Sequence, residues 1–222
     1  MKKYLGLLLI LGTFSNLLDQ VFLWEHPKAS PVYQADPCSF RTKEEPKRAR
    51  ILWKQLRSLP SSFDKQKALF EHIHQKKPRI CFGQNVPSVV TLSGTIYIDK
   101  RRKQKEESAR LAHLLMHLAN PITFKKGKAC KAQVQSALRA EAKAMSLELH
   151  IRKALKMGPP MRSFGFESVF WQTKRIQREK VVLAHLNRYP KGAPGIPPLR
   201  EGYTKRCANL QKRKSTPGRQ AQ

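Results

Sequence analysis

The chain of 222 residues contains few cysteines and few acidic residues, and its sequence lacks the signatures of several large enzyme classes. Its four cysteines are widely separated and none belongs to a C-x-x-C pair, which argues against a zinc ribbon or a thioredoxin-like redox site. The sequence has no P-loop, no G-x-G-x-x-G after a predicted strand and no G-x-S-x-G. Nucleotide binding of those kinds and serine hydrolase chemistry are therefore not indicated.

Long apolar runs are also scarce, and the run at the N-terminus is short. The cationic start Met1-Lys2-Lys3 precedes an apolar stretch over residues 4–14. This layout is typical of a secretory signal peptide, whereas a membrane-spanning helix needs about 20 apolar residues. We therefore predict an exported protein, periplasmic or secreted, with residues 1–24 as its signal peptide. The alternative is a protein anchored in the membrane by this N-terminal segment.

Export changes the meaning of the four cysteines, because an even number in an exported chain favours structural disulfides. Sequence alone allows three pairings. We predict Cys38–Cys81 and Cys130–Cys207, each of which would tie a terminal segment onto the central domain. Four separate thiols are the alternative, and they apply if the protein is cytosolic.

The shortage of acidic residues leaves the chain strongly basic, with 44 Lys and Arg against 15 Asp and Glu and a formal net charge of +29. The charge is not confined to the ends, because residues 51–187 carry 27 basic and 9 acidic residues. Such a field attracts polyanions. We expect an anionic envelope polymer or a membrane surface as the partner, and nucleic acid is less expected in an exported protein. An unidentified protein partner is a further alternative. The candidate binding residues are Lys100, Arg101, Arg102 and Lys103. The alternative is that this run is only a solvated loop.

The hydrophobic pattern predicts an α+β fold that is mostly helical, with a small antiparallel sheet formed by a β-hairpin. A polar, Pro-containing linker is expected over residues 25–45, a domain over 46–187, and a basic, Pro- and Gly-rich tail, largely disordered apart from Cys207, over 188–222. Helices are predicted over 46–59, 62–77, 106–119, 131–157 and 167–187, and strands over 79–82, 89–92 and 95–99.

The predicted helix over 106–119 contains the most informative motif of the chain, His113-Leu114-Leu115-Met116-His117. Residues i and i+4 lie on the same face of a helix, so both imidazoles can bind one metal ion. The same spacing occurs in the H-E-x-x-H helix of zinc peptidases.

The order of a strand (95–99), the histidine helix and a later helix with a glutamate resembles the core of zincin metallopeptidases over about residues 80–150. In the glutamate-ligand branch of that superfamily the third zinc ligand is a Glu on a following helix. Glu141, 24 residues after His117 and flanked by Ala140, Ala142 and Ala144, fits this pattern. Glu148, two turns later on the same face, is the reserve candidate. The resemblance thus implies zinc held by His113, His117 and Glu141.

One departure from that pattern decides the expected chemistry: Leu114 stands where zincins have the glutamate that acts as general base. Leucine can neither accept nor donate a proton, and general acid–base help is typically worth 10²–10⁴-fold. The sequence therefore favours a pseudoenzyme that acts by binding, either without a cofactor or with zinc. A residual zinc hydrolase, and an unrelated polyanion-binding helical fold in which the histidine pair is accidental, are the alternatives.

Overall fold

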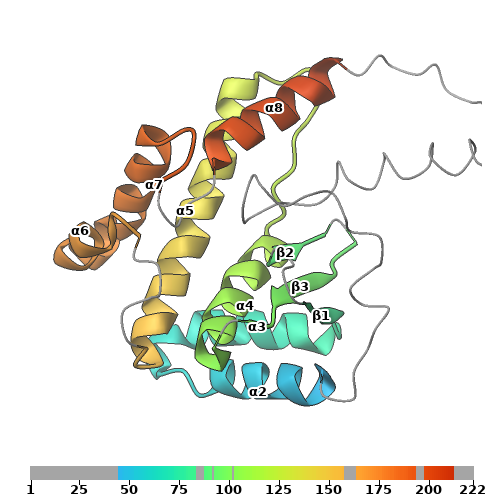
Figure 1. Ribbon diagram of the computed structural model, residues 1–222, viewed down its shortest axis with the longest axis vertical. Coiled ribbons are helices and arrows are strands. Elements are labelled where there is room, and N and C mark those ends of the chain that lie inside the picture. The colour runs from blue at the N-terminus through green and yellow to red at the C-terminus, as the bar shows by residue number, and fades with distance from the viewer. Residues whose placement is uncertain are drawn as a thin grey trace, which may run out of the picture. The chain divides into compact units, whose positions relative to one another are not determined.

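The computed structural model describes residues 45–83, 88–91, 93–101, 103–157, 164–193 and 198–212 (Figure 1). The predicted signal peptide or anchor (1–24), and the predicted linker up to residue 44, lie outside these ranges. Within them, no helix is long and apolar enough to cross a membrane. The described residues form helices and a three-stranded sheet, as expected for a mostly helical α+β protein.

The chain divides into two compact units. Unit 1 consists of the chain up to Ala119 together with Glu148–Met157, and unit 2 consists of Asn120–Leu147 and the chain from Gly158 onward. The long helix α5 (Cys130–Ala154) contributes residues to both units, and it is continuous through the point of division.

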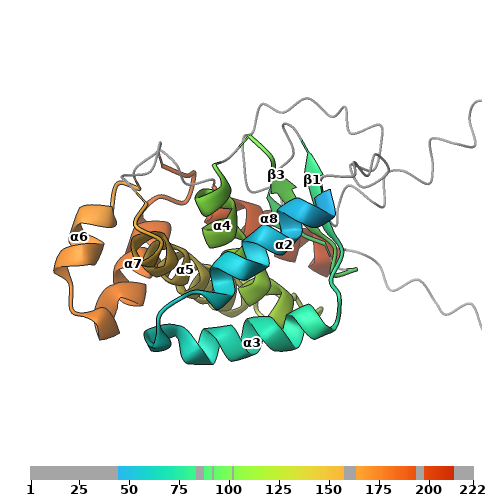
Figure 2. The ribbon, with the colours of Figure 1, turned by 90° about the horizontal axis from the view of Figure 1, so that it is seen from below.

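Unit 1 is built on three amphipathic helices: α2 (Glu45–Arg57), α3 (Asp64–Gln75) and α4 (Gln104–Ala119). A single 3₁₀ turn (Ser61–Phe63) follows Pro60 and leads into α3. Helices α2 and α3 lie side by side, and both contact α4 (Figure 2). Leu52, Trp53 and Leu56 recur at helical spacing on α2 and are buried, so this face of α2 belongs to the core.

The sheet of unit 1 comprises β1 (Ile80–Gly83), β2 (Val89–Val90) and β3 (Ile96–Asp99), in the order β1-β3-β2. Strands β2 and β3 pair antiparallel, with Val89 opposite Tyr97, which confirms the predicted hairpin. The sheet as a whole is mixed, because β1 pairs parallel with β3. The predicted antiparallel hairpin is therefore one part of a mixed sheet. The β-branched pattern identified each strand but did not specify on which side of the hairpin β1 would pair.

In unit 2 the predicted helix over 167–187 is divided into α6 (Glu167–Gln172), a 3₁₀ turn (Arg175–Gln177) and α7 (Arg178–Arg188). The break follows from the extended conformation of Thr173, which ends α6. Because the interruption resets the helical phase, Ile176 is 87% exposed, whereas Phe170 and Val182 are buried.

The tail beyond Arg188 also differs from the prediction, because Leu199–Lys212 form a helix, α8. Leu199, Tyr203 and Cys207 recur every four residues, are all buried and face the rest of unit 2. Cys207 is bonded to Cys130 at the start of α5, as predicted. Two buried side chains and the disulfide of the buried Cys207 compensate for a composition that otherwise indicates disorder. Cys81 is disulfide-bonded as well, and Cys38, its predicted partner, lies outside the described residues.

Candidate metal centre

Helix α4 carries the histidine pair on its last two turns. Its apolar residues Leu111, Leu114 and Leu115 are buried in unit 1. Glu107, in the first turn, is also buried and accepts hydrogen bonds from the guanidinium of Arg48 on α2. This anchoring by core leucines and an ion pair fixes the rotation of α4 about its axis. The rotation leaves His113 fully buried and His117 partly exposed on one face, as the i, i+4 spacing predicts.

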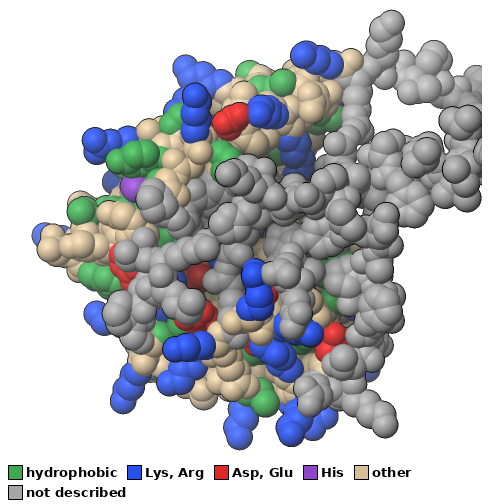
Figure 3. All heavy atoms as spheres, in the orientation of Figure 1, with side chains coloured by type: hydrophobic (Ala, Val, Ile, Leu, Met, Phe, Trp, Pro, Cys, Tyr) green, Lys and Arg blue, Asp and Glu red, His purple; other side chains and the backbone are tan. Residues whose placement is uncertain are grey.

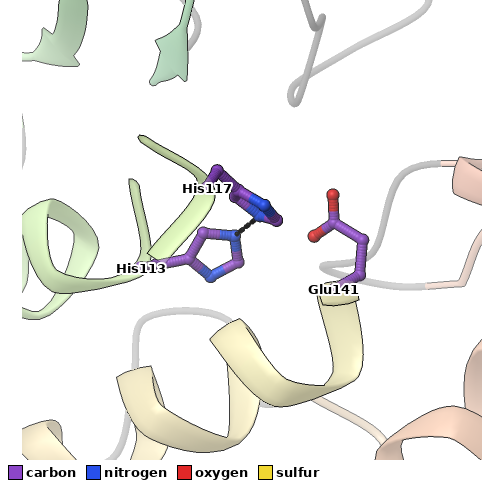
Figure 4. A group of neighbouring side chains, drawn as sticks. All are labelled: His113, His117 and Glu141. Atoms are coloured by element: carbon purple, nitrogen blue, oxygen red, sulfur yellow. Dashed lines mark hydrogen bonds between the residues drawn. The ribbon is translucent and has the colours of Figure 1, made fainter. Parts of the chain in front are cut away.

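The two imidazoles meet through the same ring nitrogen. Nε2 of His117 lies 3.0 Å from Nε2 of His113, with the rings in an edge arrangement (Figure 4). Two neutral imidazoles can share this contact only if one Nε2 carries a proton and the other accepts it. When neither nitrogen is protonated, two lone-pair donors lie 3.0 Å apart, close to the spacing of two nitrogen ligands on one metal ion.

Glu141 on α5 completes a group of three possible metal ligands with the histidines. Each residue offers one ligand atom, and the three atoms lie within 4.8 Å of one another, with the Glu141 carboxylate pointing toward the two rings (Figure 4). Ligand atoms about 2.05 Å from a tetrahedral zinc lie roughly 3.3 Å apart. The two nitrogens are already near that spacing, and the ligand oxygen of Glu141 lies within 4.8 Å of both. Nitrogen and carboxylate donors are the ligands zinc takes at three-residue sites with an open fourth position.

Glu148, the reserve ligand of the sequence analysis, instead contacts the opposite nitrogen of His113. Its Oε2 lies 3.1 Å from Nδ1 of His113 and 3.2 Å from the guanidinium of Arg110. Burial alone would raise the pKa of the Glu148 carboxyl, but the charge of Arg110 and the hydrogen bond from His113 outweigh it and hold that pKa well below its usual range. An ionised Glu148 keeps the proton of His113 on Nδ1 and leaves Nε2 as a lone-pair donor. Histidine ligands of metals are typically oriented in this way.

Tyr203 on α8 donates a hydrogen bond from its hydroxyl to Oε1 of Glu141, and both side chains are buried. Burial, together with the charge and the hydrogen bond of Glu141, raises the pKa of Tyr203 well above its ordinary value. The phenol therefore keeps its proton and acts as a hydrogen-bond donor that orients the carboxylate. Sequence reasoning missed this residue because it assigned the tail to disorder. The spacing of Tyr203 and Cys207, with Cys130 on the helix of Glu141, was the signal that could have revealed it.

The site lacks a general base at the position where a peptidase would have one. Leu114 is 2% exposed and is packed in the core of unit 1. Glu107 is engaged by Arg48, and Glu148 faces the back of His113. Among the described residues, Glu141 supplies the carboxylate of the group that contains the two histidines, and there it is a candidate ligand.

The basic run after β3 is only partly available for binding. Arg101 forms a bidentate ion pair with the buried carboxylate of Asp99, although its own side chain is half exposed. Lys100 and Lys103 are exposed, and Arg102 lies outside the described residues. The run thus contains two exposed lysines and one arginine that already has an acidic partner.

Comparisons with known proteins find no counterpart for this chain: no protein-family model, no curated protein and no solved structure matches it.

Proposed function

We propose that this protein binds one zinc ion through His113, His117 and Glu141, in a zincin-like centre that has no peptidase general base. The observation that carries the proposal is the convergence of two imidazole Nε2 atoms, 3.0 Å apart, beside a buried carboxylate. The contact between Glu148 and Nδ1 of His113 supports it, because it fixes the tautomer that a metal ligand needs.

Zinc bound by three protein ligands supplies Lewis acidity at its open fourth position. Among the described residues, those named around the site do not add the proton transfers that peptide hydrolysis needs. Leu114 has no titratable group, and Tyr203 holds its proton in a hydrogen bond to Glu141. Glu148 is paired with Arg110 and His113 on the far side of the ring. This arrangement favours metal binding over peptide hydrolysis.

The test is the zinc content of protein purified without chelator and without a histidine tag. We expect one zinc per chain, lost in His113→Ala, His117→Ala and Glu141→Ala. His72→Ala is the matched control, because His72 is an exposed histidine on α3, and it should leave the zinc content unchanged. Wild-type protein that takes up no zinc after dialysis against a zinc buffer would refute the proposal, as would equal losses in the control and the site variants.

A peptidase assay on the zinc-loaded protein tests the second half of the proposal. Turnover of a mixed peptide library should not exceed that of the His113→Ala variant. Hydrolysis that depends on the two histidines and on Glu141 would show that another residue replaces the missing general base.

A further inference from the structure

We infer that the solvent face of α2 is a binding surface for a linear phosphate polymer. Lys47, Arg50, Lys54 and Arg57, here called the α2 stripe, follow one another at intervals of three, four and three residues. At 3.6 residues per turn these four positions fall within an arc of about 80°, and they extend along about 15 Å of the helix. All four side chains are exposed. In Figure 3, Lys and Arg side chains gather along the edge where α2 lies.

The opposite face of α2 explains why the stripe has a fixed orientation. Leu52, Trp53 and Leu56 are buried, and Arg48 reaches Glu107 on α4 and the backbone oxygen of Lys100. Apolar and polar contacts together therefore fix the orientation of α2, and its cationic face stays turned toward solvent. The bond to Lys100 also places the exposed lysine of the basic run beside the first turns of α2.

Few acidic groups neutralise the stripe. Among the described residues, Lys47, Arg50 and Lys54 have no acidic partner within ion-pair distance. Arg57, at the end of the stripe, pairs with Glu71 on α3, but both side chains are about half exposed. An exposed ion pair of this kind contributes little and exchanges readily for another anion. Three unpaired cations and one loosely paired cation in a row attract a chain of negative charges.

The structure favours a flexible polymer over a bilayer or a nucleic acid. A helix that binds membranes inserts an apolar face into the headgroup region, but the apolar face of α2 is already buried in the core. Single-stranded nucleic acids are held by aromatic side chains on which bases stack. The exposed large hydrophobic residues of the described chain are Val169, Ile176 and Tyr189, and none of them belongs to α2 or α3. The surface therefore recognises charge alone, which a chain of phosphate groups supplies.

The test is the binding of end-labelled inorganic polyphosphate, measured by fluorescence anisotropy over a series of NaCl concentrations. The triple variant Lys47→Gln, Arg50→Gln, Lys54→Gln should bind at least about tenfold more weakly at physiological salt. The slope of log K against log salt should become shallower by about 2, because each contact to a flexible polyanion contributes about 0.7 to the slope. The zinc content of this variant should stay at the wild-type value, which separates this inference from the proposed metal site.

The matched control is Lys174→Gln, Arg175→Gln, Lys180→Gln, which removes two exposed lysines and one exposed arginine from unit 2. The net charge falls by the same amount, and binding should change by less than about twofold. Equal losses in the two triple variants would overturn the inference in favour of a diffuse field. Tighter, stripe-dependent binding to anionic vesicles or to single-stranded DNA would overturn it in favour of a membrane or a nucleic acid.

Discussion

The two nitrogens of the His113 ring face different environments. Nδ1 faces the ionised Glu148, and Nε2 faces His117. The division depends on Arg110, because a buried carboxylate without a cation would take up a proton and could no longer determine the tautomer of the histidine. The charge of Arg110 keeps Glu148 ionised, and Glu148 determines the tautomer of His113. A substitution of either residue therefore changes the ability of Nε2 of His113 to bind a metal.

Substitution of Glu148 should therefore weaken zinc binding although Glu148 is not a ligand. We expect Glu148→Gln to raise the zinc Kd about 10–100-fold, the usual effect of losing a partner behind a histidine ligand. The zinc Kd of each variant is measured by competition with a zinc-binding dye. Glu201→Gln, which removes an exposed carboxylate paired with Lys205, is the control and should have no effect. Because the glutamine variant also removes the negative charge beside Arg110, Glu148→Asp is a second variant, and it should retain more affinity than the glutamine variant. Equal affinities in all three proteins would contradict the argument.

Tyr203 acts on the other protein ligand through a single hydroxyl group. Tyr203→Phe removes one oxygen from a buried site and leaves the ring in place, so the fold should persist. We expect a rise of about tenfold in the zinc Kd, because the Glu141 carboxylate loses the hydrogen bond that orients it. The absorption spectrum of the Co²⁺-loaded protein should shift as well, which a role in packing alone would not cause. Tyr189→Phe, at a tyrosine that is 39% exposed, is the control. An unchanged Kd and spectrum would show that Tyr203 is only a packing residue.

Leu114 cannot be exchanged for the glutamate of a peptidase without loss of stability. Its side chain is 2% exposed, so Leu114→Glu removes a packed apolar group and buries a carboxyl. We expect a loss of about 3 kcal/mol or more in the free energy of unfolding, measured by urea denaturation. Leu118→Glu, one turn later at a partly exposed position, makes the same chemical change and should cost less. A stable Leu114→Glu protein with peptidase activity would mean that this position faces the metal instead of the core.

At the scale of elements, local patterns in the sequence predicted the helices whose formation depends on local contacts. The helices predicted over 106–119 and 131–157 correspond to α4 and α5. The pairing of His113, His117 and Glu141 followed from helical spacing and from a resemblance, and the structure brings the three side chains together.

The failures concern elements whose structure depends on distant contacts. Helix α8 has a composition typical of disorder, and it is held by the bond of Cys207 to Cys130, 77 residues away. The parallel pairing of β1 with β3 likewise depends on contacts outside either strand. The periodicity within 199–212 points to the contact of Tyr203 with Glu141 only when it is combined with the Cys130–Cys207 pairing, which ties α8 to the helix of Glu141.

Helix α8 should therefore depend on the disulfide for its stability. The chain-entropy estimate for closing a loop of this length is about 4.5 kcal/mol, and measured losses for native disulfides are about 2–5 kcal/mol. We expect the double variant Cys130→Ser, Cys207→Ser to lose stability within that range in urea denaturation, and to bind zinc no better than Tyr203→Phe. Double substitution avoids an unpaired thiol. An unchanged midpoint would show that Leu199, Tyr203 and neighbouring contacts hold α8 without the bond.

At the scale of the whole molecule, the net charge of +29 acts on the two proposed ligands in opposite directions. A divalent cation approaching His113, His117 and Glu141 is repelled by the field of the protein, whereas a phosphate polymer approaching the α2 stripe is attracted. Salt screens both effects, because the Debye length falls from about 30 Å at 0.01 M to about 8 Å at 0.15 M ionic strength. Ionic strength should thus separate the two activities within one protein.

We expect zinc affinity to rise a few-fold as NaCl increases from about 0.01 to 0.15 M, while polyphosphate affinity falls by more than tenfold over the same range. Isothermal titration in a buffer without phosphate measures the first quantity, and anisotropy measures the second. The triple variant Lys47→Gln, Arg50→Gln, Lys54→Gln should show a smaller rise in zinc affinity, because three of the repelling charges are gone. Zinc affinity that falls with salt in parallel with polyphosphate affinity would place the bound zinc on exposed groups instead of in the buried centre, because a cation held at such groups by attraction loses affinity when charges are screened.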